Sequence, residues 1–172
     1  MTSSQPSPFG RYDDSSGDDT IHEIRLLNMP VRLLASGRQH HDELMHEFAV
    51  LAVSLENRDS VPARMLEMID TLGTRYGRAA DRPDSLVDEA IARGEDVIDL
   101  TYQVPAHVVE AADALEQMMD EADDFCRNEQ MLTLGRSDVQ KRFAKWYLEE
   151  FRRQVNGEEP RAWNGPMDEP AA

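Results

Sequence analysis

The residues best suited to chemistry lie together in one segment, His40-His41-Asp42-Glu43-Leu44-Met45-His46-Glu47. Glu43 and His46 form a Glu-x-x-His pair, the spacing that supplies metal ligands on one helix face in di-iron bundles. Such a site needs a second pair and two further glutamates, and the sequence contains no second pair. The segment also lacks the His-Glu-x-x-His spacing of zinc proteases. A metal site at His41, Glu43 and His46 is therefore one alternative. The simpler expectation is that His40 and His46 are solvated and that His41 is a hydrogen-bonded core residue.

A second group of candidates is acidic and crowds one side of the helix that Pro105 opens. Paired carboxylates can act as acid and base where burial separates their pKa values. These carboxylates lie opposite the apolar stripe of the helix, so we expect water to surround them. We also expect part of their charge to pair with the basic final helix. A docking surface for a basic partner is one alternative, and a calcium or catalytic site is another, although no Asp-x-Asp-x-Asp-Gly loop is present. The acidic residues are Glu110, Asp113, Glu116, Asp120, Asp123 and Asp124.

The remaining reactive and aromatic side chains are expected to be structural. Cys126 falls on the apolar stripe, where a thiol behaves as a small hydrophobe. Aromatic residues recur at helical spacing near the end of the chain, which is more typical of a core than of a partner site. They are Phe143, Trp146, Tyr147 and Phe151. No phosphate loop and no Gly-x-Ser-x-Gly elbow is present. We assign no catalytic residue and expect no cofactor.

Two strands and five helices are expected to position these residues. Strict alternation of apolar and polar residues predicts one strand, and a less regular stretch predicts another. Both strands run into a proline that begins a helix, which leaves an internal repeat as an open alternative. Ser60 is expected to cap one helix, and Ser137 with Gln140 forms a capping-box pattern. Glycines at 77 and 94 are expected to end helices. The predicted strands are 21–27 and 98–104, and the predicted helices are 31–55, 61–76, 85–93, 105–126 and 138–155.

These elements predict a mainly α (α+β) fold. We expect a bundle of four longer helices plus one short helix, with a small two-stranded β-sheet at one side. Residues 20–156 are predicted to form a single domain. Residues 1–19 are expected to be a disordered N-terminal tail, because they contain too few apolar residues to offset the entropy of ordering. Residues 157–172, rich in proline and glutamate, are expected to be a flexible C-terminal tail.

Composition narrows the function. The 172 residues carry a net charge of −16, which argues against nucleic acid and against anionic membranes, because both bind through Lys and Arg. A single cysteine excludes an internal disulfide. No apolar run is long enough for a transmembrane helix, and no signal peptide is recognisable, so a cytoplasmic location is expected.

Several stretches resemble a group of small uncharacterised actinobacterial proteins. They are Ile24-Arg-Leu-Leu-Asn-Met-Pro-Val-Arg-Leu-Leu, His40-His-Asp-Glu-Leu-Met-His-Glu-Phe, Asp99-Leu-Thr-Tyr-Gln-Val-Pro, Ala122-Asp-Asp-Phe-Cys-Arg-Asn-Glu-Gln-Met-Leu-Thr-Leu and Phe143-Ala-Lys-Trp-Tyr-Leu-Glu-Glu-Phe. The resemblance implies a place in partner-switching signalling, beside anti-sigma kinases, their antagonists and serine phosphatases. It implies no catalytic residue and assigns no role to any position.

Three functional hypotheses follow. The first is a non-enzymatic regulatory or adaptor protein that binds a basic patch of another protein through an acidic face centred on Asp113, Glu116, Asp120 and Asp124. The second is a metal-binding helical protein, enzyme or sensor, that uses His41, Glu43 and His46. The third is a small-ligand sensor with a methionine-lined core, formed by Met45, Met65, Met68, Met118 and Met119. The free edges of a two-stranded sheet also permit a homodimer.

Overall fold

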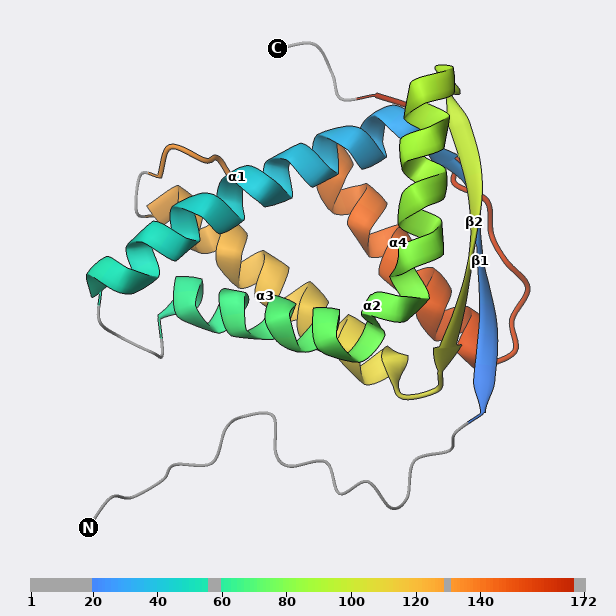
Figure 1. Ribbon diagram of the computed structural model, residues 1–172, viewed down its shortest axis with the longest axis horizontal. Helices are drawn as coiled ribbons and strands as arrows, with labels where there is room; N and C mark the ends of the chain where they lie inside the picture. Colours follow the sequence, from blue (N-terminus) through green and yellow to red (C-terminus); the bar gives the residue numbers. More distant parts are fainter. Residues whose placement is uncertain (1–19, 56–59, 129–130, 169–172) are drawn as a thin grey trace.

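The computed structural model describes residues 20–55, 60–128 and 131–168. The predicted disordered tail, residues 1–19, lies outside this part of the chain. The elements in chain order are β1 (Ile21–Pro30), α1 (Val31–Leu55), α2 (Val61–Arg93), β2 (Val97–Pro105), α3 (Val108–Asn128) and α4 (Asp138–Val155). Figure 1 shows a frame of helices with a two-stranded sheet along one side. The mainly α (α+β) class with a small sheet is confirmed.

The sheet is antiparallel and contains one bulge. Ile24 pairs with Tyr102 and Leu26 pairs with Leu100, and all four side chains are buried. Beyond Leu26 two residues of β1 lie opposite one residue of β2, because Leu26 pairs with Leu100 and Met29 with Ile98. The extra residue is taken up at Asn28, whose φ of 59° is left-handed, a conformation that asparagine tolerates. Pairing therefore resumes after the bulge, and β1 extends to Pro30 rather than ending at residue 27.

Helix α2 is bent. The predicted helices 61–76 and 85–93 are both present, but the residues between them are helical too, so the predicted stop at Gly77 is absent. Figure 1 shows one arm of α2 beside α3 and the other arm beside β2. Gly77 and Pro83, both weak helix formers, lie between the arms. The predicted cap at Ser60 and the left-handed stop at Gly94 (φ 68°) are confirmed.

The bend of α2 connects two hydrophobic cores. We call the first the aromatic core, which includes Ile24, Leu26, Val87, Leu100, Tyr102, Phe143, Trp146, Phe151 and Trp163. We call the second the methionine core, which consists of Leu44, Phe48, Met65, Met68, Met118, Ala122 and Cys126. One arm of α2 supplies Met65 and Met68, and the other supplies Val87.

The prediction of a flexible C-terminal tail is wrong for residues 157–168, and 169–172 lie outside the described residues. This segment runs back along the sheet, and Trp163 is only 3% exposed (Figure 1). Its indole contacts Phe143 and Trp146, with ring centroids 5.2 and 5.5 Å away. The backbone N–H of Trp163 donates to Leu27 O at 2.9 Å, and Asn28 Nδ2 donates to the backbone O of Trp163 at 2.8 Å. One buried tryptophan thus anchors a segment whose other residues are mostly exposed.

A buried carboxylate holds the start of the same segment. Glu150 is fully buried and accepts hydrogen bonds from Arg161 N at 2.9 Å, Arg153 Nη1 at 2.8 Å and Gln154 Nε2 at 3.0 Å. Burial alone raises the pKa of Glu150, but these hydrogen bonds outweigh it and hold the pKa below its ordinary value. Gln154 also exchanges two hydrogen bonds, each 2.8 Å long, with the backbone of Arg25. Together these contacts join α4, β1 and the C-terminal segment.

Candidate functional site

A cavity of about 540 Å³ lies where the aromatic core and the methionine core meet. This volume falls within the range of small-molecule sites, roughly 300–1,000 Å³. All four helices and β2 supply apolar side chains to it, so residues far apart in sequence share one wall. These side chains are Leu33, Leu34, Leu44, Met65, Val87, Leu100, Tyr102, Met119, Ala122, Phe143, Ala144 and Tyr147.

Small residues help to keep the cavity open. Gly37 in α1, Ala122 in α3 and Ala144 in α4 all line it. A Cβ atom added at Gly37 would have no neighbour within 4 Å, so the space in front of this glycine is empty. The bend of α2 also contributes, because it allows Met65 and Val87 to reach the same cavity from separate arms.

An ion pair forms the main polar feature of the lining. Asp123 is 4% exposed and accepts from the Arg136 backbone N–H at 2.7 Å, from Nε at 3.0 Å and from Nη2 at 2.8 Å. Arg136 Nη2 also contacts Asp120 at 3.0 Å. Gly135 lets the chain come this close to α3, because a Cβ there would lie 3.2 Å from Asp123 Oδ1. The Arg136 guanidinium is therefore fixed in position, and Asp120 and Asp123 neutralise its charge.

Other polar groups reach the cavity from α1, β2 and α4. Tyr147 donates its hydroxyl hydrogen bond to the Tyr102 hydroxyl at 2.9 Å. Helix α1 contributes Arg38, whose Nη1 contacts Asp88 at 2.6 Å, together with His40, His41 and Asp42. The cavity thus combines apolar walls with hydrogen-bonding groups of both kinds, the composition typical of sites for organic ligands.

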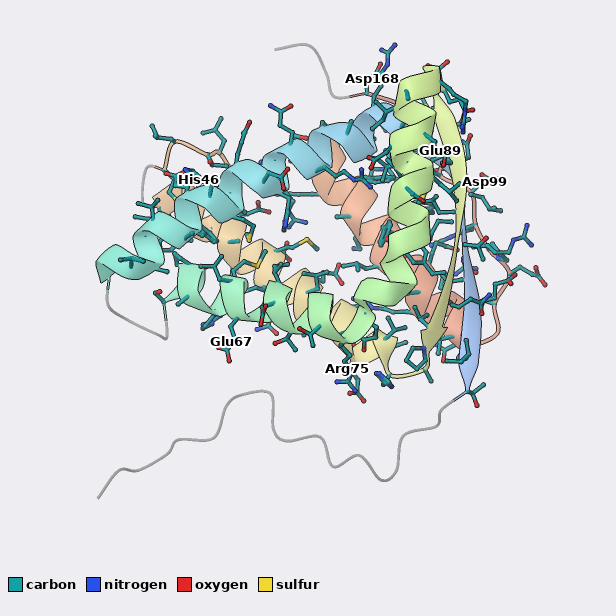
Figure 2. The ribbon with its side chains drawn as sticks, viewed as in Figure 1. His46, Glu67, Arg75, Glu89, Asp99 and Asp168 are labelled. Atoms are coloured by element: carbon teal, nitrogen blue, oxygen red, sulfur yellow. The ribbon has the colours of Figure 1, made fainter. Side chains whose placement is uncertain are left out.

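The predicted metal ligands do not converge. His41 is half-buried and lines the cavity, whereas Glu43 and His46 are exposed and line a second, neighbouring hollow. Figure 2 shows His46 on the side of α1 that faces the segment after α3. Within residues 20–55, 60–128 and 131–168, no three His, Cys, Asp or Glu side chains are grouped so that they could hold a metal ion.

Arginines of the same chain engage the acidic face of α3. Asp113 and Glu116 bind Arg152 of α4 at 2.6 and 2.5 Å, which confirms the predicted pairing with the final helix. Asp120 binds Arg136, and Asp124 binds Arg127 at 2.8 Å on the same helix. The expectation that water surrounds these carboxylates is wrong for Asp123, which is buried. Its charge is stabilised there by Arg136 and Lys141 beside it.

Cys126 and three of the four aromatic residues, Phe143, Trp146 and Phe151, are buried in the two cores, as predicted. Burial raises the pKa of the Cys126 thiol to about 11, and the negative charges of Asp123 and Glu47 act in the same direction. A thiol with this pKa is almost entirely protonated near neutral pH and is a poor nucleophile. Phe143, Trp146 and Phe151 are buried in the aromatic core, whereas Tyr147 is half-buried at its edge.

Sequence patterns missed several lining residues. Gly37, Tyr102 and Arg136 had no motif that marked them for a site. Gln140 was recognised only for its capping box with Ser137, which is confirmed. No helix in the part of the chain that the structure describes has the length and apolar character needed to cross a membrane. Comparison of the chain with protein families, curated proteins and solved structures found no match.

Proposed function

We propose that the protein is a non-enzymatic regulatory protein that binds a small organic molecule in the cavity between its two cores. The observation that carries this proposal is the 540 Å³ cavity itself, lined by all four helices and β2. It develops the hypothesis of a ligand sensor with a methionine-lined core. Met65 and Met119 line the cavity, whereas Met45, Met68 and Met118 are not part of its lining.

The lining favours an uncharged, mostly apolar ligand with one hydrogen-bonding end. Most of the wall is aliphatic or aromatic, so burial of apolar surface supplies most of the binding energy. An anion would have to compete with Asp123 and Asp120 for Arg136, and would leave a buried carboxylate without its partner. A neutral donor or acceptor would instead bond to the ion pair or to the tyrosine hydroxyls without disturbing them.

A regulatory role follows from the position of the ligand. A molecule in the cavity contacts both cores at once, so it stabilises the arrangement of helices to which it binds best. The resemblance to proteins of partner-switching signalling supports the same setting. An adaptor role through the acidic face of α3 is less favoured, because Asp113, Glu116 and Asp120 already bind arginines of this chain.

Two matched glycine substitutions test the proposal. Gly37→Leu places a side chain into the cavity, whereas Gly73→Leu places the same side chain on α2 outside it, and an added Cβ meets nothing within 4 Å at either position. The probe is N-phenyl-1-naphthylamine, an uncharged aromatic fluorophore, titrated into each protein. We expect saturable one-site binding that Gly37→Leu weakens about tenfold or more, since overfilling a packed site costs about 1–3 kcal/mol. Gly73→Leu should leave binding unchanged.

Methyl NMR of methionine locates the probe. The Met65 and Met119 signals should shift on titration, whereas that of Met167, which is exposed in the C-terminal segment, should not. Equal binding by both glycine variants, or shifts spread evenly over all methionines, would show that the cavity is not the site.

A further inference from the structure

A second hollow, of about 1,040 Å³, lies between α1 and residues 132–140, next to the cavity. We call it the acidic groove. One wall is α1 and the other is formed by residues 132–137. Its lining consists of His40, Glu43, His46, Glu47, Val50, Leu51, Leu132, Thr133, Leu134, Gly135, Ser137 and Gln140. Three apolar side chains in this lining are strongly exposed: Val50 at 57%, Leu132 at 95% and Leu134 at 77%.

The exposed leucines sit on an anchored backbone. Glu47 accepts from Leu132 N at 3.0 Å and from Thr133 N at 2.8 Å. Burial alone raises the pKa of Glu47, but these bonds outweigh it and hold the pKa below its ordinary value. Asp123 holds the Arg136 N–H at the other end of the segment. Because both ends are anchored, Leu132 and Leu134 are presented to solvent in a defined geometry.

We propose that the acidic groove docks a cationic amphipathic helix of a partner protein. The lining supplies Glu43 and Glu47, and none of the described residues in it is lysine or arginine. The groove therefore pairs exposed apolar anchors with negative charge, which complements leucines flanked by Lys or Arg on a partner helix. Its α1 wall from His40 to Leu51 is roughly 16 Å long, enough for about three turns of that helix.

A defined peptide tests this directly. The probe is a fluorescein-labelled helical peptide of leucine and lysine, with leucines spaced i, i+3, i+4 and i+7. Its counterpart carries glutamate at every lysine position. Fluorescence anisotropy should show that the lysine peptide binds and the glutamate peptide does not. The affinity for the lysine peptide should fall as the salt concentration rises. The double substitution Leu132→Ser with Leu134→Ser should weaken peptide binding about tenfold or more, because a few anchor residues carry most of the binding energy of an interface. Both side chains are exposed, so the variant keeps the fold.

Matched substitutions separate the groove from the general acidity of the chain. Glu43→Lys should reduce binding, whereas Glu67→Lys, on the outer side of α2, should not (Figure 2). Ile91→Ser removes an apolar side chain that is 45% exposed elsewhere and should also have no effect. Equal loss in the groove and control variants would overturn the proposal. So would a dimer in sedimentation velocity that the double serine variant makes monomeric, because the occupant would then be a second copy.

Discussion

The aromatic core and the methionine core fill space in different ways. In the aromatic core the rings of Phe143, Trp146 and Trp163 lie 5.2–5.7 Å apart. Hydrogen bonds that Glu150 accepts and that Asn28 donates fix the chain around them. The methionine core relies on flexible thioether side chains, with one ring pair between Phe48 and Phe125. Rigid rings define one shape, whereas methionine adapts to several.

The cavity lies between these two kinds of packing. Tyr102 and Phe143 form part of its wall on the aromatic side, and Met65 and Met119 form part of it on the other. If the cavity binds the ligand proposed above, we expect the aromatic wall to keep its geometry and the methionine wall to adjust. The difference suits a site that must hold a ligand firmly and still accept variation in its shape.

The largest effect should come from removing the indole that closes the aromatic core. Trp163→Ala is expected to lower the free energy of unfolding by about 3–5 kcal/mol, because it empties a buried site. Urea denaturation followed by circular dichroism measures this. Met167→Ala, in the same segment but 39% exposed, is the control and should cost little. A Trp163→Ala protein as stable as the parent would mean that the C-terminal segment contributes nothing to the core.

The next effect concerns the buried carboxylate. Glu150→Gln keeps the volume but loses charge-assisted hydrogen bonds, and should cost about 2–3 kcal/mol at neutral pH. Because the folded-state pKa lies below the ordinary 4.5, the stabilisation is complete above that value. It is lost as the pH falls through the lower folded-state pKa. Urea titrations at a series of pH values should show the two proteins converging in acid, and a constant difference would contradict this.

A smaller effect is expected at the hydroxyl pair. Tyr147→Phe and Tyr102→Phe each remove the same 2.9 Å hydrogen bond, at a cost of about 1 kcal/mol. If that bond accounts for the loss, the double variant should be less destabilised than the sum of the two single variants. Strict additivity in this thermodynamic cycle would show that the hydroxyls do not interact.

Volume-conserving substitutions in the methionine core should also have a small effect. Met65→Leu and Met68→Leu conserve volume and should each change the free energy of unfolding by less than about 1.5 kcal/mol. Phe143→Leu in the aromatic core should cost more, because a planar ring with defined ring contacts is lost. Equal losses in both cores would remove the distinction between them. Thermal unfolding of the three variants under identical conditions provides the comparison.

Local patterns predicted most of the fold. The 3.6-residue rhythm, the cap at Ser60, the capping box at Ser137 and the stop at Gly94 are all properties of neighbouring residues. The continuation of α2 through Gly77 and the docking of residues 157–168 were missed. The docking depends on contacts with a distant element, because Trp163 packs against α4. The continuation joins two predicted helices through the weak helix formers Gly77 and Pro83.

The site was harder to predict than the fold. His41 was expected to be a core histidine, but it lines the cavity. Other lining residues come from α2, β2, α3 and α4 as well as α1, so no local pattern around His41 indicates the cavity. No fixed sequence spacing predicts an ion pair such as Asp123 with Arg136, because the path of the chain between α3 and α4 sets the distance between the two side chains. Of the five methionines in the ligand-sensor hypothesis, Met65 and Met119 line the cavity. Hydrophobic pattern alone does not separate a filled core from a hollow one.

The bulge at Asn28 has a consequence for synthesis on the ribosome. Strand β2, which pairs with β1, ends at Pro105. The backbone of Trp163 accepts a hydrogen bond from Asn28 Nδ2 and donates one to Leu27 O, next to the bulge. At translation rates of about 5–20 residues per second, β1 emerges roughly ten seconds before that tryptophan is made. During this interval the nascent strand has an open edge available to other chains. We therefore expect β1 to be most open to pairing with other chains until its contacts with β2 and with residue 163 have formed.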